Sequence, residues 1–120
     1  MKANGKNFKM FVYCHHDYMD MQPEPTFSTW ENQEVANKAV NEMRKYYNSG
    51  TISAPREVSP IEFFMARQSK YWKGCEEALD KAALDCSQEW LDEYSYYVAH
   101  KEYDVASLLS DWKWKRYAGV

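Results

Sequence analysis

The sequence predicts an α+β protein that is predominantly α-helical, with one N-terminal strand, or a small sheet built on it, followed by three or four helices. Three observations indicate this class. An alternating apolar run lies near the start, two Ser-x-x-Glu capping boxes follow, and apolar residues then recur with a helical period. A chain of 120 residues fits a single domain spanning 1–120.

Residues 8–14 predict the strand, because alternate side chains of a strand point to opposite faces. One face would carry Phe8, Met10, Val12 and Cys14, and the other Lys9, Phe11 and Tyr13. Both faces are largely apolar, so we expect the strand to be covered on both sides.

Residues 15–26 predict a loop, because Pro23 and Pro25 disfavour a helix there. A lone strand leaves its backbone groups unpaired. Its partner must therefore come from residues 51–53, from a hairpin within 16–27 or from another chain. The last option makes a homodimer reasonable.

The first helix is predicted to follow the capping box of Ser28 and Glu31, because an apolar stripe with a helical period comes next. Asn48, Ser49 and Gly50 would end this helix. The stripe consists of Val35, Ala36, Ala39, Val40, Met43, Tyr46 and Tyr47.

A second, longer helix is predicted from the capping box of Ser59 and Glu62, which has Pro60 at the first helical position. Its apolar stripe keeps phase to Cys86 and then slips by about one residue. The slip predicts a bend or break near Ser87, with a break at Gly74 as the alternative. A last helix is expected after Asp104.

Charge is distributed unevenly along the chain. The formal net charge is −3, but residues 1–75 carry +2, residues 76–111 carry −8 and residues 112–120 carry +3. The basic end could pair with the acidic segment inside the molecule, or the two could meet different partners.

An acidic ridge is expected in the acidic segment, because one continuous helix would place its members on a single side. The ridge consists of Asp85, Glu89, Asp92 and Glu93, with Tyr96 next in line. Three interpretations remain open: a solvated face, a face that pairs with the basic tail, or a surface that meets a basic partner protein. In the last case Tyr96 and neighbouring tyrosines would add apolar contact area.

The C-terminal segment suggests an alternative function, since aromatic residues interleaved with cations can stack bases and hold phosphates. The residues concerned are Lys113, Trp114, Lys115 and Arg116. They would make the chain an accessory protein that binds nucleic acid directly.

A third hypothesis is a metal-dependent enzyme centred on His15, His16 and Asp17. Adjacent residues of a strand point to opposite faces, and no zinc-ligand spacing is matched. No motif for nucleophilic catalysis or phosphate binding accompanies these residues. We therefore expect a non-catalytic protein without cofactor or metal.

The cysteines indicate a reducing environment. Cys14, Cys75 and Cys86 are odd in number and form no Cys-x-x-Cys pair, so we expect buried free thiols in a cytoplasmic protein. No stretch approaches the length of a membrane span, and the apolar run at the N-terminus is too short for a signal peptide.

In general character the chain resembles the small phage-encoded inhibitors of host defence or host enzymes, a class that includes anti-CRISPR and anti-restriction proteins. The resemblance rests on size, single-domain organisation, the absence of catalytic motifs and the acidic ridge. It implies an inhibitor or modulator of a host nucleic-acid-processing or defence enzyme. Such a protein would act in the cytoplasm of the bacterial host on a protein that itself binds nucleic acid.

Overall fold

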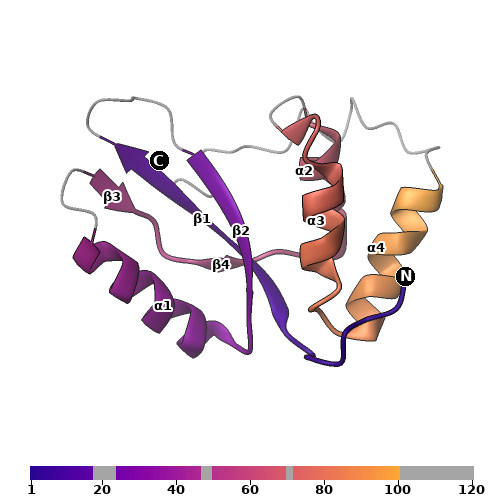
Figure 1. Ribbon diagram of the computed structural model, residues 1–120, viewed down its shortest axis with the longest axis horizontal. Helices are drawn as coiled ribbons and strands as arrows, with labels where there is room; N and C mark the ends of the chain where they lie inside the picture. Colours follow the sequence, from indigo (N-terminus) through magenta and orange to yellow (C-terminus); the bar gives the residue numbers. More distant parts are fainter. Residues whose placement is uncertain (18–23, 47–49, 70–71, 101–120) are drawn as a thin grey trace.

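The computed structural model describes residues 1–17, 24–46, 50–69 and 72–100 (Figure 1). In chain order the elements are β1 (Lys9–Asp17), β2 (Glu24–Trp30), α1 (Gln33–Tyr46), β3 (Gly50–Ile52), β4 (Arg56–Glu57), α2 (Pro60–Gln68), α3 (Glu76–Ala83) and α4 (Gln88–Ala99). The α+β class is confirmed. The predicted number and order of strands are wrong, because the described part of the chain has four strands and α1 lies between β2 and β3.

Strand β1 is the centre of the sheet, and all its neighbours run antiparallel to it. It pairs with β2 along one edge, and with β3 and then β4 along the other. Between those two strands, Ser53 continues the pairing: its N–H donates to the Cys14 carbonyl at 2.9 Å, and its Oγ accepts from the Cys14 N–H at 2.8 Å. The predicted strand is thus confirmed and extended to Asp17. Its pairing therefore does not require a second chain.

The loop predicted for residues 15–26 is wrong at both of its ends, since His15–Asp17 continue β1 and Glu24–Thr26 begin β2. Residues 18–23 of this prediction lie outside the described residues. Pro25 lies opposite Cys14 in the ladder. Proline has no N–H to donate, but β2 is at the edge of the sheet, where one side of the backbone needs no strand partner. Proline therefore excludes a helix here without excluding a strand.

The capping box predicted at Ser28 and Glu31 is also wrong, because Ser28 lies within β2 opposite Phe11. Helix α1 begins later, and its cap is Asn32, whose Oδ1 accepts the Val35 N–H at 2.9 Å. The second capping box is confirmed. Ser59 Oγ accepts the Glu62 N–H at 3.3 Å, and the Glu62 carboxylate accepts the Ser59 N–H at 3.2 Å.

The long second helix is broken at both of the places that the sequence offered as alternatives. Helix α2 already ends at Gln68, and the stretch between it and α3 contains Gly74, whose φ of +91° is a left-handed conformation that an α-helix does not adopt. The Gly74 N–H donates to the Glu76 carboxylate at 2.9 Å. Ser87 caps a new helix by accepting the Trp90 N–H at 3.2 Å. The product is three short helices, α2, α3 and α4. The helix expected after Asp104 lies outside the described residues.

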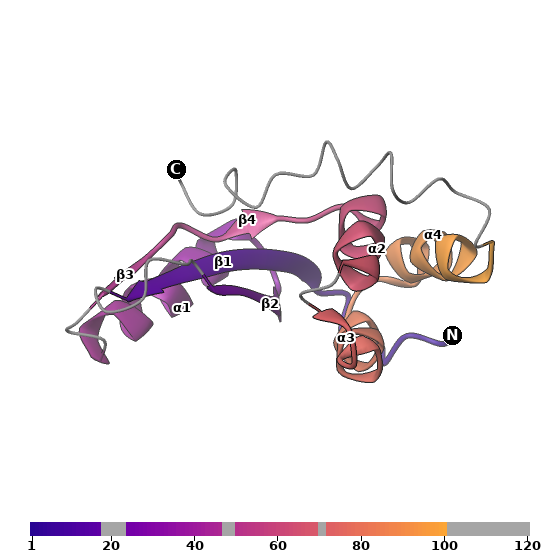
Figure 2. The same ribbon diagram turned by 90° about the horizontal axis from the view of Figure 1, so that it is seen from above.

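The main core joins β1 to these three helices. Figures 1 and 2 show α1 on one side of the molecule and α2, α3 and α4 gathered on the other. The core is formed by Met10, Val12, Cys14, Val58, Phe63, Phe64, Leu79, Ala83, Cys86, Leu91 and Tyr94. On the opposite face of β1, Phe11 is fully buried with its ring 5.8 Å from that of Trp30, so both faces of the strand are covered as predicted.

One polar network links α2, α3 and α4. The Asp80 carboxylate accepts two hydrogen bonds from the Arg67 guanidinium, at 3.0 and 3.1 Å, and a third from the Tyr94 hydroxyl. The hydrogen bond to Asp80 raises the pKa of Arg67, while burial, aided by Asp80, raises the pKa of Tyr94. Each of the three residues comes from a different helix, so Asp80 fixes the helices relative to one another.

Replacing Asp80 with alanine should lower the free energy of unfolding by about 2 kcal/mol, because the half-buried Arg67 cation and the Tyr94 hydroxyl both lose their acceptor. Urea unfolding measures the change. The control is Glu77→Ala on the same helix, where the exposed side chain should contribute less than about 0.5 kcal/mol. Equal losses in the two variants would show that the network contributes little.

The three cysteines differ in exposure. Cys14 and Cys86 are buried, and burial raises their pKa values to about 11 and about 12. Cys75 is exposed, so the expectation that all three thiols are buried is wrong at this position. It lies in the turn between α2 and α3, where the predicted long helix is interrupted.

A thiol reagent at neutral pH should therefore label the native chain at Cys75 alone. The other two thiols are inaccessible and stay protonated, whereas the thiolate is the reactive form. Mass spectrometry of labelled peptides, with and without urea, gives the sites. Rapid native labelling of Cys14 or Cys86 would contradict the core described above.

Candidate functional site

Helix α4 carries most of the predicted acidic ridge. Glu89, Asp92, Glu93 and Tyr96 all lie on it and all four are exposed. Asp85 precedes the helix, in the turn after α3. The predicted ridge of four carboxylates on one helix is therefore reduced to three, because α4 begins only at Gln88 and Asp85 lies outside it.

Asp85 binds residues of the N-terminal segment. Its carboxylate accepts the Asn4 side-chain amide at 3.0 Å and lies 3.7 Å from the Lys6 ammonium. The backbone joins the same contact, since the Phe8 N–H donates to the Asp85 carbonyl at 2.9 Å. Asp85 thus has internal partners, and we assign it a structural role.

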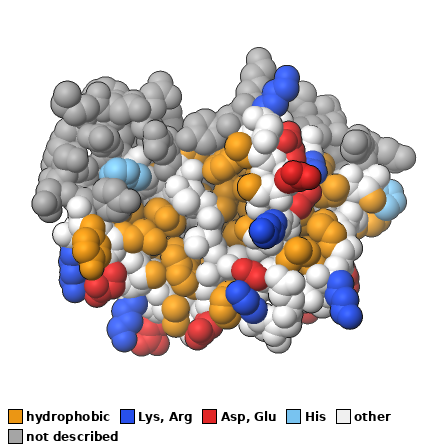
Figure 3. Space-filling view, viewed as in Figure 1, with side chains coloured by type: hydrophobic (Ala, Val, Ile, Leu, Met, Phe, Trp, Pro, Cys, Tyr) orange, Lys and Arg blue, Asp and Glu red, His pale blue; other side chains and the backbone are white. Residues whose placement is uncertain are grey.

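The three carboxylates of α4 are not neutralised by any cation in the described part of the chain, and the helix itself contains neither lysine nor arginine. Their hydrogen bonds come from neutral groups: Gln88 donates to Asp92 at 2.8 Å, and the Tyr97 hydroxyl to Glu93 at 3.4 Å. On the face shown in Figure 3, acidic and basic side chains are interspersed.

An aromatic patch continues the acidic face toward the end of α4. Tyr96 is 51% exposed. Its ring stacks on that of His100 with centroids 4.0 Å apart, and His100 Nδ1 lies 2.9 Å from the Tyr96 carbonyl. The stacking holds Tyr96 against the helix end, so this residue presents a pre-ordered apolar surface beside the carboxylates.

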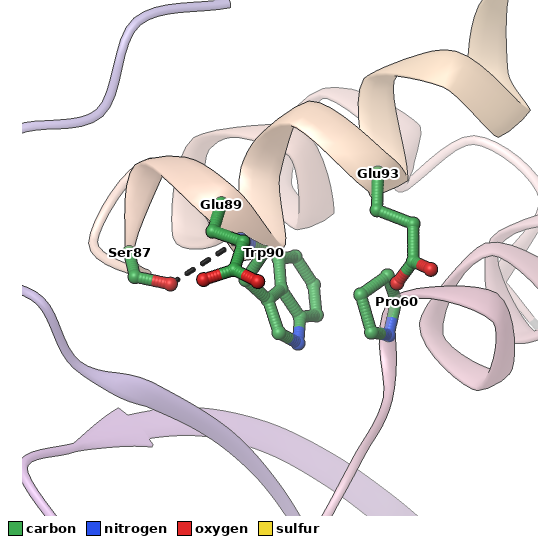
Figure 4. A pocket seen from close by; sticks show the side chains of 5 residues that line it. All are labelled: Pro60, Ser87, Glu89, Trp90 and Glu93. Carbon is green, nitrogen blue, oxygen red and sulfur yellow. Dashed lines mark hydrogen bonds between the residues drawn. The ribbon is translucent and has the colours of Figure 1, made fainter.

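An open pocket of about 340 Å³ lies beside the first turns of α4. It is lined by Pro60 at the start of α2 and by Ser87, Glu89, Trp90 and Glu93. Figure 4 shows the side chains of Glu89 and Glu93 extending from α4, with the Trp90 indole between them and Pro60 close to Glu93. The two capped helix starts, at Ser59 and at Ser87, therefore form the two sides of this pocket.

The alternative sites are less well described. Lys113, Trp114, Lys115 and Arg116 lie outside the described residues, as does any pairing between this segment and the acidic face. The backbones of His15, His16 and Asp17 pair with β3. Within the described ranges, no group of three or more His, Cys, Asp and Glu residues is arranged to hold a metal ion.

Sequence reasoning did not identify Trp90, Pro60 and Ser87 as part of a site. The helical spacing of Trp90 predicts an inward residue, and its ring does pack on Phe63, with 5.6 Å between centroids. The sequence does contain one indication of this site, the pattern Ser87-x-x-Trp90. A serine that caps a helix accepts a hydrogen bond from the backbone of the third residue after it, which here is Trp90.

Comparison with protein-family models, curated proteins and solved structures gives no match to this chain. No helix in the described part of the chain combines the length and apolar character needed to cross a lipid bilayer. The geometry of α4 and its surroundings is therefore the basis for a functional proposal.

Replacing Ser87 with alanine should destabilise the protein by about 1 kcal/mol, because the Trp90 N–H at the start of α4 loses its acceptor. The matched control is Ser95→Ala inside the same helix, where alanine is the better helix former and little change is expected. Urea unfolding of both variants provides the comparison. A stable S87A protein would mean that the cap does not fix the start of α4.

Proposed function

We propose that this chain is a non-catalytic protein-binding protein that inhibits or modulates a nucleic-acid-processing or defence enzyme of a bacterial host. Its binding surface is the outer face of α4, made of Glu89, Asp92, Glu93 and Tyr96. The partner is a protein with a basic surface of the kind that grips nucleic acid. In this proposal the chain acts in the host cytoplasm.

The observation that carries the proposal is that no cation within the described ranges neutralises the negative charge of α4. Like charges at i and i+4 cost a helix a few tenths of a kcal/mol, as Glu89 and Glu93 do here. Mixed charges would avoid this cost, as on the face shown in Figure 3. A basic partner would turn the repulsion into attraction and would raise the rate of association.

Tyr96 supports a protein partner over a purely ionic one. Tyrosine is enriched at interfaces because its ring gives a large contact area at low entropic cost. The exposed ring, held by His100, lies next in line after the carboxylates. The partner class itself is inferred from the resemblance to phage-encoded inhibitors described above.

The test is capture of a partner from a bacterial lysate on the tagged full chain, followed by mass spectrometry. The wild-type chain should retain one stoichiometric host protein that acts on nucleic acid. The triple variant E89K/D92K/E93K should lose it, because the charge of the face is reversed. The activity of the captured enzyme should fall when the wild-type chain is added.

The matched control is E31K/E42K/E77K, which makes the same change in net charge at exposed positions away from α4. This control should retain the partner. Thermal unfolding of both variants must show that each is folded. Retention of the same protein by E89K/D92K/E93K, or capture of nucleic acid alone, would refute the proposed function.

A further inference from the structure

The pocket between the start of α2 and α4 has a chemical character that the proposed function does not use. It combines two carboxylates, Glu89 and Glu93, with the indole of Trp90 (Figure 4). The carboxylates are one helical turn apart, so their β-carbons are separated by about 6 Å. A planar cation could lie between them.

Trp90 is held as a fixed wall of this pocket. Its indole N–H donates to the Val58 carbonyl at 3.2 Å. Its ring packs on Phe63 and on Tyr94, with centroids 5.6 Å apart in both cases. Because these contacts restrain the ring from the core side, little conformational entropy remains to be lost when a ligand binds.

The two carboxylates of the pocket, Glu89 and Glu93, are also accessible to a cation. Among the described residues, Glu93 receives one hydrogen bond, from Tyr97 at 3.4 Å, and neither Glu89 nor Glu93 has an ion pair. The pocket is open and exposes both carboxylates to water. An incoming cation therefore need not displace any cation from the described part of the chain.

We propose that this pocket binds the guanidinium group of an arginine side chain supplied by the partner protein. Guanidinium is planar, stacks on aromatic rings and donates in pairs to carboxylates, whereas the lysine ammonium is a more strongly hydrated point charge. The pocket volume of about 340 Å³ is ample for this group. The inference rests on the proposed function and identifies the partner chemistry at its centre.

The test uses a simple probe, N-acetyl-arginine amide, added to the isotope-labelled full chain. The indole N–H signals of the five tryptophans are followed by NMR, and W90F identifies the signal of Trp90. That signal should shift and saturate with a dissociation constant in the millimolar range, as expected for a small ligand. The lysine analogue should bind more weakly, and the neutral citrulline analogue should produce no saturable shift.

Two double variants separate this pocket from general electrostatics. E89Q/E93Q removes both pocket carboxylates and should weaken binding of the arginine probe by about tenfold or more. E77Q/D92N removes the same charge at exposed positions that do not line the pocket, and should leave binding within about twofold. Equal weakening in both variants, an equal response to citrulline or no saturation up to about 50 mM would overturn the proposal.

The outcomes also distinguish this inference from the proposed function. If E89K/D92K/E93K loses the captured partner but the arginine probe does not bind, α4 is the interface and the arginine pocket is wrong. If the probe binds at Trp90 but no partner is captured, the pocket is a cation site, and its assignment to a partner protein fails together with the proposed function.

Discussion

The arrangement of α2, α3 and α4 depends on the carboxylate of Asp80. It receives two hydrogen bonds from Arg67 on α2 and one from Tyr94 on α4. The contact is bidentate and half-buried, which distinguishes it from the exposed ion pairs that contribute little to stability. Short helices of 8 to 12 residues are marginal by themselves, so tertiary contacts of this kind must fix their positions.

This constraint reaches the proposed site through Tyr94. The residue is fully buried, and its ring packs on Phe63 and on Trp90. Holding Tyr94 inward sets the rotation of α4, so that Glu89 and Glu93 point away from the core. The same rotation brings Trp90 to the pocket wall beside Pro60. The orientation of the proposed binding surface thus depends on the contacts that Tyr94 of α4 makes with the core and with Asp80.

The sequence predicted the features that depend on local chemistry. Alternation located β1, and the capping box located the start of α2, because both signals lie within a few residues. It did not predict β2, since Pro25 suggests a loop until its place at a sheet edge is known. The long apolar stripe concealed two breaks, and only tertiary structure brings Arg67, Asp80 and Tyr94 together. The ridge was predicted at Asp85, Glu89, Asp92 and Glu93, of which α4 carries the last three. The pocket beside them was not predicted, because Pro60 reaches it only through tertiary structure.

The hydrogen bonds of Asp80 couple α4 to the rest of the helical layer. A double-mutant cycle tests this coupling most directly, using Asp80→Asn, Tyr94→Phe and the combined variant, with the free energy of unfolding measured in urea. We expect a coupling energy of about 1 kcal/mol or more between the two positions. Additive effects, with coupling below about 0.3 kcal/mol, would contradict it. The position of α4 would then have to be explained by apolar packing alone.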